Sequence, residues 1–171
     1  RQGASRTAYL FLRGMHGDRL IGGGSRSVTV TASNGSTATD TDWLAGRPRE
    51  VRRLTSAGTE LEGSLHSYWV QATTPVDALG QQARIVLENK VEGRIRVGTG
   101  SPAIQTRSTT TYNNQAQATR VFDEGDLSTG DDNRCTKTTY FENTARWIVD
   151  KPARTTLDFD SSKAALLTVQ G

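Results

Sequence analysis

The sequence predicts an all-β protein built from antiparallel hairpins, and three observations support this fold class. Threonine supplies 24 of the 171 residues, and its β-branched, polar side chain suits strands that have one face in water. Val, Ile, Leu and Phe together supply only 33 residues, a thin supply for a large core. Short strand-like runs alternate with Gly, Pro and Asn turns, as in antiparallel meanders. Because the net charge is only +3, the chain is expected to fold.

The N-terminal strands are predicted from apolar patterns between turn signals. Residues 7–15 form an apolar and aromatic run that ends at a glycine-rich turn. In the following hairpin, Val28 and Val30 alternate with hydroxyl residues, which places the valines on one face. Asn34-Gly35 then supplies the two positive-φ positions of a type I′ turn. The strands expected in this part of the chain are 7–15, 25–32, 36–43 and 49–56.

Proline and glycine breakers divide the rest of the chain into further strands. Pro75 and Gly80 interrupt one pair of strands, Pro102 precedes another strand, and Pro152 separates the last two. One weak helix is predicted at 161–167, where a Ser cap precedes good helix formers. We expect a single β-rich module over residues 1–171, taken from a longer polypeptide. The remaining strands are expected at 60–73, 83–97, 105–113, 116–123, 136–141, 145–150 and 154–159.

The composition argues against several functional classes. No stretch approaches the roughly 20 apolar residues of a membrane span. The single cysteine, Cys135, cannot form an internal disulfide and is expected to be a small buried hydrophobe. The 21 basic residues are interleaved with 18 acids, so no nucleic-acid footprint is indicated. The densest basic cluster is expected to form a solvated strand face; its members are Arg47, Arg49, Arg52 and Arg53.

Catalytic and metal-binding patterns are weak. The two histidines, His16 and His66, have no Gly-x-Ser-x-Gly nucleophile nearby, and we expect a surface turn for the first and a solvent-facing strand position for the second. Zinc would need a Cys and His cluster that this inventory cannot supply. The acids and amides within 123–133 leave calcium as a minority alternative, although their spacing matches no EF-hand. We therefore expect a non-enzyme without a cofactor or bound metal.

Three segments share one order of features: an aromatic residue, a polar turn, a strand and a second turn. They occupy about 41–58, 109–125 and 138–152. Such self-similarity indicates a repeated hairpin unit. Gly46 and Gly125 would permit positive φ at turns. The positions that define the repeat are Trp43, Gly46, Arg47, Gly58, Tyr112, Gly125, Tyr140 and Asp150.

The repeated pattern resembles the tyrosine-aspartate (YD) repeat of the rearrangement-hotspot (RHS) family, whose consensus is roughly Tyr-Asp-x-x-Gly-Arg, a strand and a Gly turn. Trp43 stands at the Tyr position of the first copy, and Gly46-Arg47 matches the Gly-Arg. The later copies keep Tyr112 and Tyr140 but lack the Asp and Gly. Residues 6–9, 13–18, 42–47 and 131–140 also look like the region ahead of the main repeat array in large secreted actinobacterial RHS proteins.

This resemblance implies a curved or spiralling shell of β-hairpins, similar to the C component of Tc toxins and to teneurins. In bacterial members the shell encloses or presents a variable C-terminal toxin. The implied location is secreted or cell-surface, and the implied partners are neighbouring repeats of the same polypeptide and an enclosed toxin domain. No catalytic residue is carried over.

Two alternatives remain open. A carbohydrate- or cell-surface-binding β module would use Tyr68, Trp69 and Trp147 as rings for sugar stacking. A glycoside hydrolase or lyase fragment is motivated only by the supply of acids.

Overall fold

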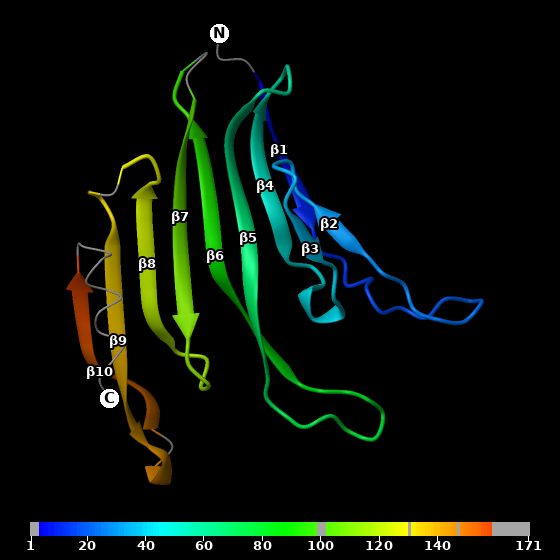
Figure 1. Ribbon diagram of the computed structural model, residues 1–171, viewed down its shortest axis with the longest axis vertical. Coiled ribbons are helices and arrows are strands. Elements are labelled where there is room, and N and C mark those ends of the chain that lie inside the picture. The colour runs from blue at the N-terminus through cyan, green and yellow to red at the C-terminus, as the bar shows by residue number, and fades with distance from the viewer. Residues whose placement is uncertain (1–3, 99–101, 130, 147, 159–171) are drawn as a thin grey trace.

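The computed structural model describes residues 4–98, 102–129, 131–146 and 148–158, which form an all-β, antiparallel architecture (Figure 1). Eight strands make one sheet in the order β1-β4-β5-β6-β7-β8-β9-β10, and the short hairpin β2–β3 forms a separate two-stranded sheet. No described helix is long and apolar enough to cross a membrane. The elements are β1 (Ser5–Phe11), β2 (Thr29–Thr31), β3 (Thr37–Thr39), 3-10 helix η1 (Asp42–Leu44), β4 (Pro48–Thr55), β5 (Glu60–Ala72), β6 (Arg84–Arg96), β7 (Ala103–Tyr112), β8 (Ala118–Asp126), β9 (Arg134–Asn143), 3-10 helix η2 (Thr144–Arg146) and β10 (Ile148–Asp158).

Five turns use the same three-residue loop, at 21–23, 33–35, 56–58, 78–80 and 114–116. In each, the residue before the loop accepts a backbone N–H from the third loop residue and donates its own N–H to the residue after the loop. The third residue has positive φ, which is a common way to close a three-residue hairpin. The type I′ prediction for Asn34-Gly35 is therefore wrong: Gly35 alone has positive φ. These third residues are Gly23, Gly35, Gly58, Gly80 and Ala116.

Two predicted boundaries near the C-terminus also differ from the structure. Ala116 belongs to a turn, so β8 begins two residues later than predicted. The two strands expected at 145–150 and 154–159 form one strand, β10, which continues through Pro152. Among the described residues β10 pairs only with β9, and the register shifts beside the proline. An edge strand tolerates proline because the missing N–H has no second neighbour to bond. The helix predicted at 161–167 lies outside the described residues.

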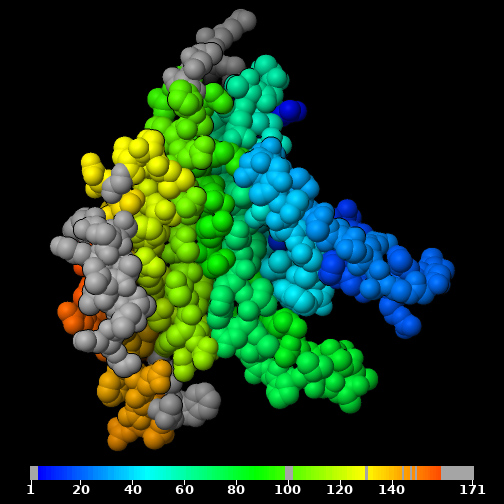
Figure 2. All heavy atoms as spheres, viewed as in Figure 1, coloured from blue at the N-terminus to red at the C-terminus, as the bar shows by residue number. Residues whose placement is uncertain are grey.

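The N-terminal part of the sheet has a second layer. Residues 12–47, which include β2 and β3, project from this end of the sheet in Figure 2 and pack partly against it. Val30 is half-buried between two exposed threonines, as the alternation predicts. Among the described residues the buried apolar side chains are Leu12, Ala32, Leu54, Leu65 and Cys135. All but the last belong to this two-layered region.

The C-terminal part, β7 to β10, is held mainly within the plane of the sheet. Its side chains are mostly half-buried or exposed, with Cys135 buried. One row of directly opposed residues runs from Thr110 through Val121 and Thr136 to Leu157. Such cross-strand neighbours each contribute roughly 0.2–1 kcal/mol. Threonine side chains thus supply part of the cross-strand contacts in a region where few of the described side chains are buried.

Candidate functional site

Tyrosines on alternate strands form one repeated contact. Each donates its hydroxyl to a backbone carbonyl that lies 20 to 24 residues earlier, on or beside the preceding strand of the sheet. Trp43, the aromatic of the first predicted repeat, makes a different contact: the Arg84 guanidinium lies 4.1 Å from its ring centroid. The three bonds join Tyr68 to Pro48 (2.7 Å), Tyr112 to Glu88 (2.6 Å) and Tyr140 to Ala118 (3.0 Å).

The other predicted repeat positions lie in turns, bulges and an edge strand. Gly46 has φ 79°, and the side chain of Arg47 donates to the carbonyl of Val86 while covering the Tyr68 ring. Gly58 closes the β4–β5 loop. Gly125 has positive φ, as predicted, but it sits in a bulge within β8 because the register with β7 shifts there. Asp150 is an exposed residue of the edge strand β10.

A buried carboxylate, Asp40, organises the insertion, which is the segment of residues 12–47 between β1 and its partner strand β4. It is 1% exposed and accepts the backbone N–H groups of Arg13 (2.6 Å), Gly14 (2.9 Å) and Met15 (3.3 Å). Burial raises the pKa of this carboxyl, but the three N–H bonds outweigh burial, so the pKa is lowered. Nothing in the sequence pattern around Asp40 distinguishes it from an exposed strand residue, and sequence reasoning missed it.

A second polar cluster joins the insertion to three strands of the sheet. Glu50 on β4 is 2% exposed and accepts from the backbone N–H of Ser33 (3.0 Å) and from its hydroxyl. Arg94 on β6 reaches across β5 to Glu50 (2.7 Å) and also pairs with Glu60 (2.9 Å). The position between them is Gly63, where an added Cβ would lie 2.7 Å from the Arg94 guanidinium. Because Gly63 has no side chain, the Arg94 guanidinium can pass over β5 to reach Glu50.

Arg49, beside Glu50, is the candidate site residue whose placement differs most from the sequence prediction. In the register of β1 with β4, Leu10 pairs with Glu50 and Phe11 with Pro48, so Arg49 is the extra residue of a β-bulge. The Arg49 side chain faces the insertion and is 5% exposed, not solvated. It donates to the carbonyl of His66 (2.7 Å) and to the Ser36 hydroxyl (3.0 Å).

The charge of Arg49 has no carboxylate within ion-pair distance among the described residues. Burial lowers its pKa, and the carboxylates of Glu92 and Glu50 oppose that effect from a distance. A buried charge without a direct partner is costly. Its Nε is buried with no hydrogen-bond partner in the described structure, and the same holds for the hydroxyl of Thr41.

Both unpartnered groups belong to residues that line one groove of about 470 Å³ between the insertion and the sheet. Thr41 caps η1, yet its hydroxyl makes no capping bond. Hydroxyl groups dominate the polar lining, and the rings of Trp43 and Tyr68 add apolar surface. The charged lining residues besides Arg49 are Lys90 and Glu92, which pair with each other at 3.1 Å.

The remaining catalytic and metal-binding predictions involve residues with structural partners. His16 accepts the N–H of Val28 through Nδ1 rather than bonding within its turn. The prediction that His66 faces solvent is wrong: its side chain is 15% exposed and contacts Ser64 and Glu88. Cys135 is buried, as predicted. Among the described residues no cluster of three His, Cys, Asp or Glu side chains is arranged to hold a metal ion. Within 123–133, the segment considered for calcium, the Asp132 carboxylate accepts the backbone N–H of Asp126.

The rings proposed for sugar stacking are also engaged. Trp69 packs against Tyr112, with ring centroids 5.3 Å apart. Tyr68 is covered on one side by Arg47. The side chain of Trp147 lies outside the described residues.

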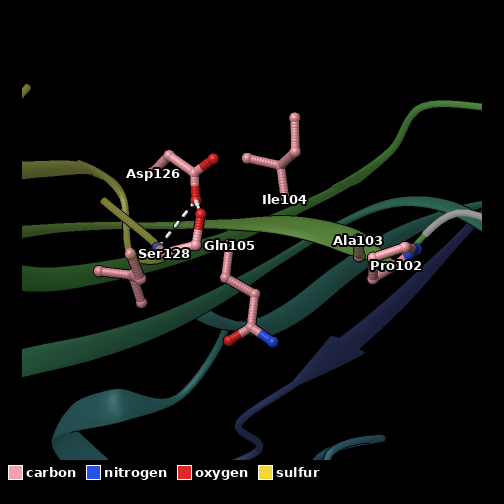
Figure 3. A pocket seen from close by; sticks show the side chains of 7 residues that line it. Pro102, Ala103, Ile104, Gln105, Asp126 and Ser128 are labelled. Atoms are coloured by element: carbon pink, nitrogen blue, oxygen red, sulfur yellow. Dashed lines mark hydrogen bonds between the residues drawn. The ribbon is translucent and has the colours of Figure 1, made fainter.

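A second hollow of about 380 Å³ lies where β7 begins and β8 ends (Figure 3). The side chains of Ile104 and Gln105 point to opposite sides of β7, with Asp126 and Ser128 next to them at the end of β8. The Asp126 carboxylate accepts the backbone N–H (2.9 Å) and the hydroxyl (2.8 Å) of Ser128. This hollow is thus shaped by a turn whose polar groups bond to one another.

Comparisons with protein-family models, with curated proteins and with solved structures gave no match to this chain.

Proposed function

We propose that this chain is a non-enzymatic wall segment: part of a β-sheet shell in a secreted or cell-surface bacterial protein of the RHS/YD-repeat type. In this role it pairs with neighbouring repeats of the same polypeptide and helps to enclose or present a C-terminal effector. The observation that carries the proposal is the sheet itself, which extends over eight antiparallel strands and whose C-terminal part is covered by few of the described residues.

The repeated tyrosine contact supports a modular wall. Tyr68, Tyr112 and Tyr140 lie on β5, β7 and β9, so every second strand is tied by a side chain to the strand before it. A bond of this kind contributes about 1 kcal/mol and fixes the spacing of each hairpin relative to the previous one. Repetition of one local unit is how extended β architectures grow without a central core.

The sheet edges support neighbouring repeats as partners. Among the described residues β1 and β10 each pair on one side only. On β1, Tyr9 and Phe11 stack with ring centroids 5.8 Å apart, and they are 60% and 45% exposed. An exposed edge with stacked rings is suited to another strand, because its backbone groups and its apolar surface are both unused.

The test is the mass of the purified chain measured by light scattering at increasing concentration. The proposal predicts self-association above the 18.6 kDa of one chain, because separated sheet edges pair with each other. Phe11→Lys at the β1 edge should lower this association. Leu79→Lys, which changes an 82% exposed residue in the β5–β6 loop, is the matched control and should leave it unchanged. A constant mass of one chain at all concentrations, or hydrolysis of a polysaccharide by the pure chain, would contradict the proposal.

A further inference from the structure

The Arg49 groove has features of a ligand site that a wall segment does not require. It is formed where the insertion meets the sheet, and a β-bulge turns the Arg49 side chain into this junction. Bulges frequently re-aim a side chain next to binding sites. The guanidinium is nearly inaccessible to water, yet the described residues offer it only a carbonyl and hydroxyls as partners.

Charge in the groove favours an anion. Arg49 and Lys90 bring two positive charges against the single carboxylate of Glu92. That carboxylate is already neutralised by Lys90 at 3.1 Å and by Arg107 at 3.4 Å. The other acid close to Arg49 in sequence, Glu50, is committed to Arg94 and Ser33.

The free hydrogen-bonding capacity fits a carboxylate. Nη2 of Arg49 donates one of its two hydrogens to Ser36, and Nε donates none to a described residue. An Nε–H and a neighbouring Nη–H form the fork that binds the two oxygens of a carboxylate. The Thr41 hydroxyl is a further unpartnered polar group among the residues lining the groove.

The rest of the lining selects the body of the ligand. The threonines of the β3 strand and the serines beside Arg49 offer hydroxyls that both donate and accept, and Trp43 and Tyr68 supply apolar ring surface. A volume of about 470 Å³ lies in the lower half of the usual range for ligand pockets, roughly 300–1,000 Å³. Hydroxyls, rings and one buried cation in a small groove together match a sugar that carries a carboxylate.

We propose that the groove between the insertion and strands β4–β6 binds the carboxylate of an acidic sugar, such as a uronic acid unit, through Arg49, with Thr41 as a second polar contact. Because Nε and the Thr41 hydroxyl are closed off from solvent, the insertion shifts slightly to admit the carboxylate. This site is independent of the wall proposal: it concerns a face of the sheet and not its edges.

The experiment titrates the complete 171-residue chain with sodium D-glucuronate and follows backbone amide chemical shifts. We expect saturable shifts confined to residues 36–49 and 65–68. D-Glucose with matched sodium chloride should give none, and inorganic phosphate should bind at least about tenfold more weakly, because it lacks the sugar body. Equal responses to glucose, glucuronate and phosphate, or no saturable response to glucuronate, would overturn the proposal.

Three variants assign the binding to the proposed groups. Thr41→Val replaces an unpartnered hydroxyl by a methyl group, so the fold is retained, and Arg49→Lys keeps the charge but removes the fork. Each should weaken glucuronate about tenfold, the equivalent of one charge-assisted hydrogen bond. Arg53→Met is the matched control, because Arg53 lies on the same strand with a side chain that is 57% exposed, and its affinity should be unchanged. Unchanged affinity in Thr41→Val, or equal loss in Arg53→Met, would contradict the assignment.

Discussion

The two ends of the sheet are stabilised in different ways. At the N-terminal end, the insertion covers β4 and β5, and buried carboxylates hold the two layers together: Asp40 within the insertion and Glu50 at the junction. At the C-terminal end, β7 to β10 have tyrosine contacts, cross-strand pairs and surface ion pairs such as Arg134 with Asp123. The comparison shows that one continuous sheet can combine a polar, two-layered region with a region, β7 to β10, in which few of the described side chains are buried.

The largest effect is expected from Asp40→Ala. Three backbone N–H groups would lose their acceptor, and each unsatisfied buried donor costs about 1–3 kcal/mol, so the free energy of unfolding should fall by about 4 kcal/mol. Asp18→Ala, at an exposed site of the same segment, should change it by less than about 0.5 kcal/mol. Urea unfolding measures both. Equal values for the two variants would show that the insertion does not depend on Asp40.

The same carboxylate gives a pH dependence. Folding lowers the pKa of Asp40 below its value in the unfolded chain, about 3.8. The contribution of Asp40 to the free energy of unfolding is therefore fully present above pH 3.8 and is lost as the pH falls through the pKa of the folded state. The difference in unfolding free energy between the wild type and Asp40→Ala should therefore be constant from pH 7 to 5 and shrink below about pH 3.8. A difference that stays constant down to pH 2 would contradict this assignment.

Arg94→Met tests the junction between the two regions. It leaves Glu50 buried with Ser33 as its main partner, and we expect a loss of about 3 kcal/mol, which is typical of breaking a buried pair. The control is Arg53→Met, whose exposed pair with Glu62 should contribute less than about 1 kcal/mol. Denaturant unfolding of both variants measures the difference. Similar losses for the two would mean that the junction adds no special stability.

Removal of one tyrosine hydroxyl tests the stability of the C-terminal region, β7 to β10. Tyr140→Phe removes the bond to the carbonyl of Ala118, and we expect a loss of about 1 kcal/mol. Tyr68→Phe, which removes the equivalent bond in the covered region, should cost a similar amount. Thermal unfolding measures the stability of both variants. An unchanged stability in both would contradict a stabilising role for the repeated tyrosine contact.

The smallest expected effect is a gain. Ala116 holds the left-handed position that Gly58 holds in the equivalent β4–β5 loop, with φ 62°. Left-handed backbone costs a residue with a Cβ about 1–2 kcal/mol, so Ala116→Gly should stabilise the chain by about 0.5–1 kcal/mol after the entropy of glycine is deducted. Gly58→Ala should destabilise it by a similar amount. Thermal unfolding measures both variants. A loss of stability in Ala116→Gly, or a gain in Gly58→Ala, would contradict the equivalence of the two loops.

Much of the fold follows from local sequence signals, because strands and turns are set by neighbours in the chain. The threonine content, the alternation around Val30 and glycines such as Gly58 predict the strands and their loops. The polar core could not be predicted this way. Asp40, Glu50 and Arg49 are buried by contacts with residues far along the chain, and a one-residue bulge is enough to turn Arg49 away from solvent.

The structure around Pro152 also depends on the position of its strand in the sheet. Pro152 indicates a break when the sequence is considered locally, yet the chain continues as a strand because β10 lies at the edge of the described sheet. Whether a residue is central, at an edge or covered depends on the order of strands in space.

Amide hydrogen exchange of the purified chain tests the contrast between the two regions most directly. We expect the amides of β4 and β5 to exchange most slowly, through global unfolding, and those of β9 and β10 to exchange much faster, through local opening of the sheet. In Asp40→Ala the protection of β4 and β5 should fall toward that of β9 and β10. Uniform protection across the wild-type sheet, or slower exchange in β9 and β10 than in β4 and β5, would contradict the account.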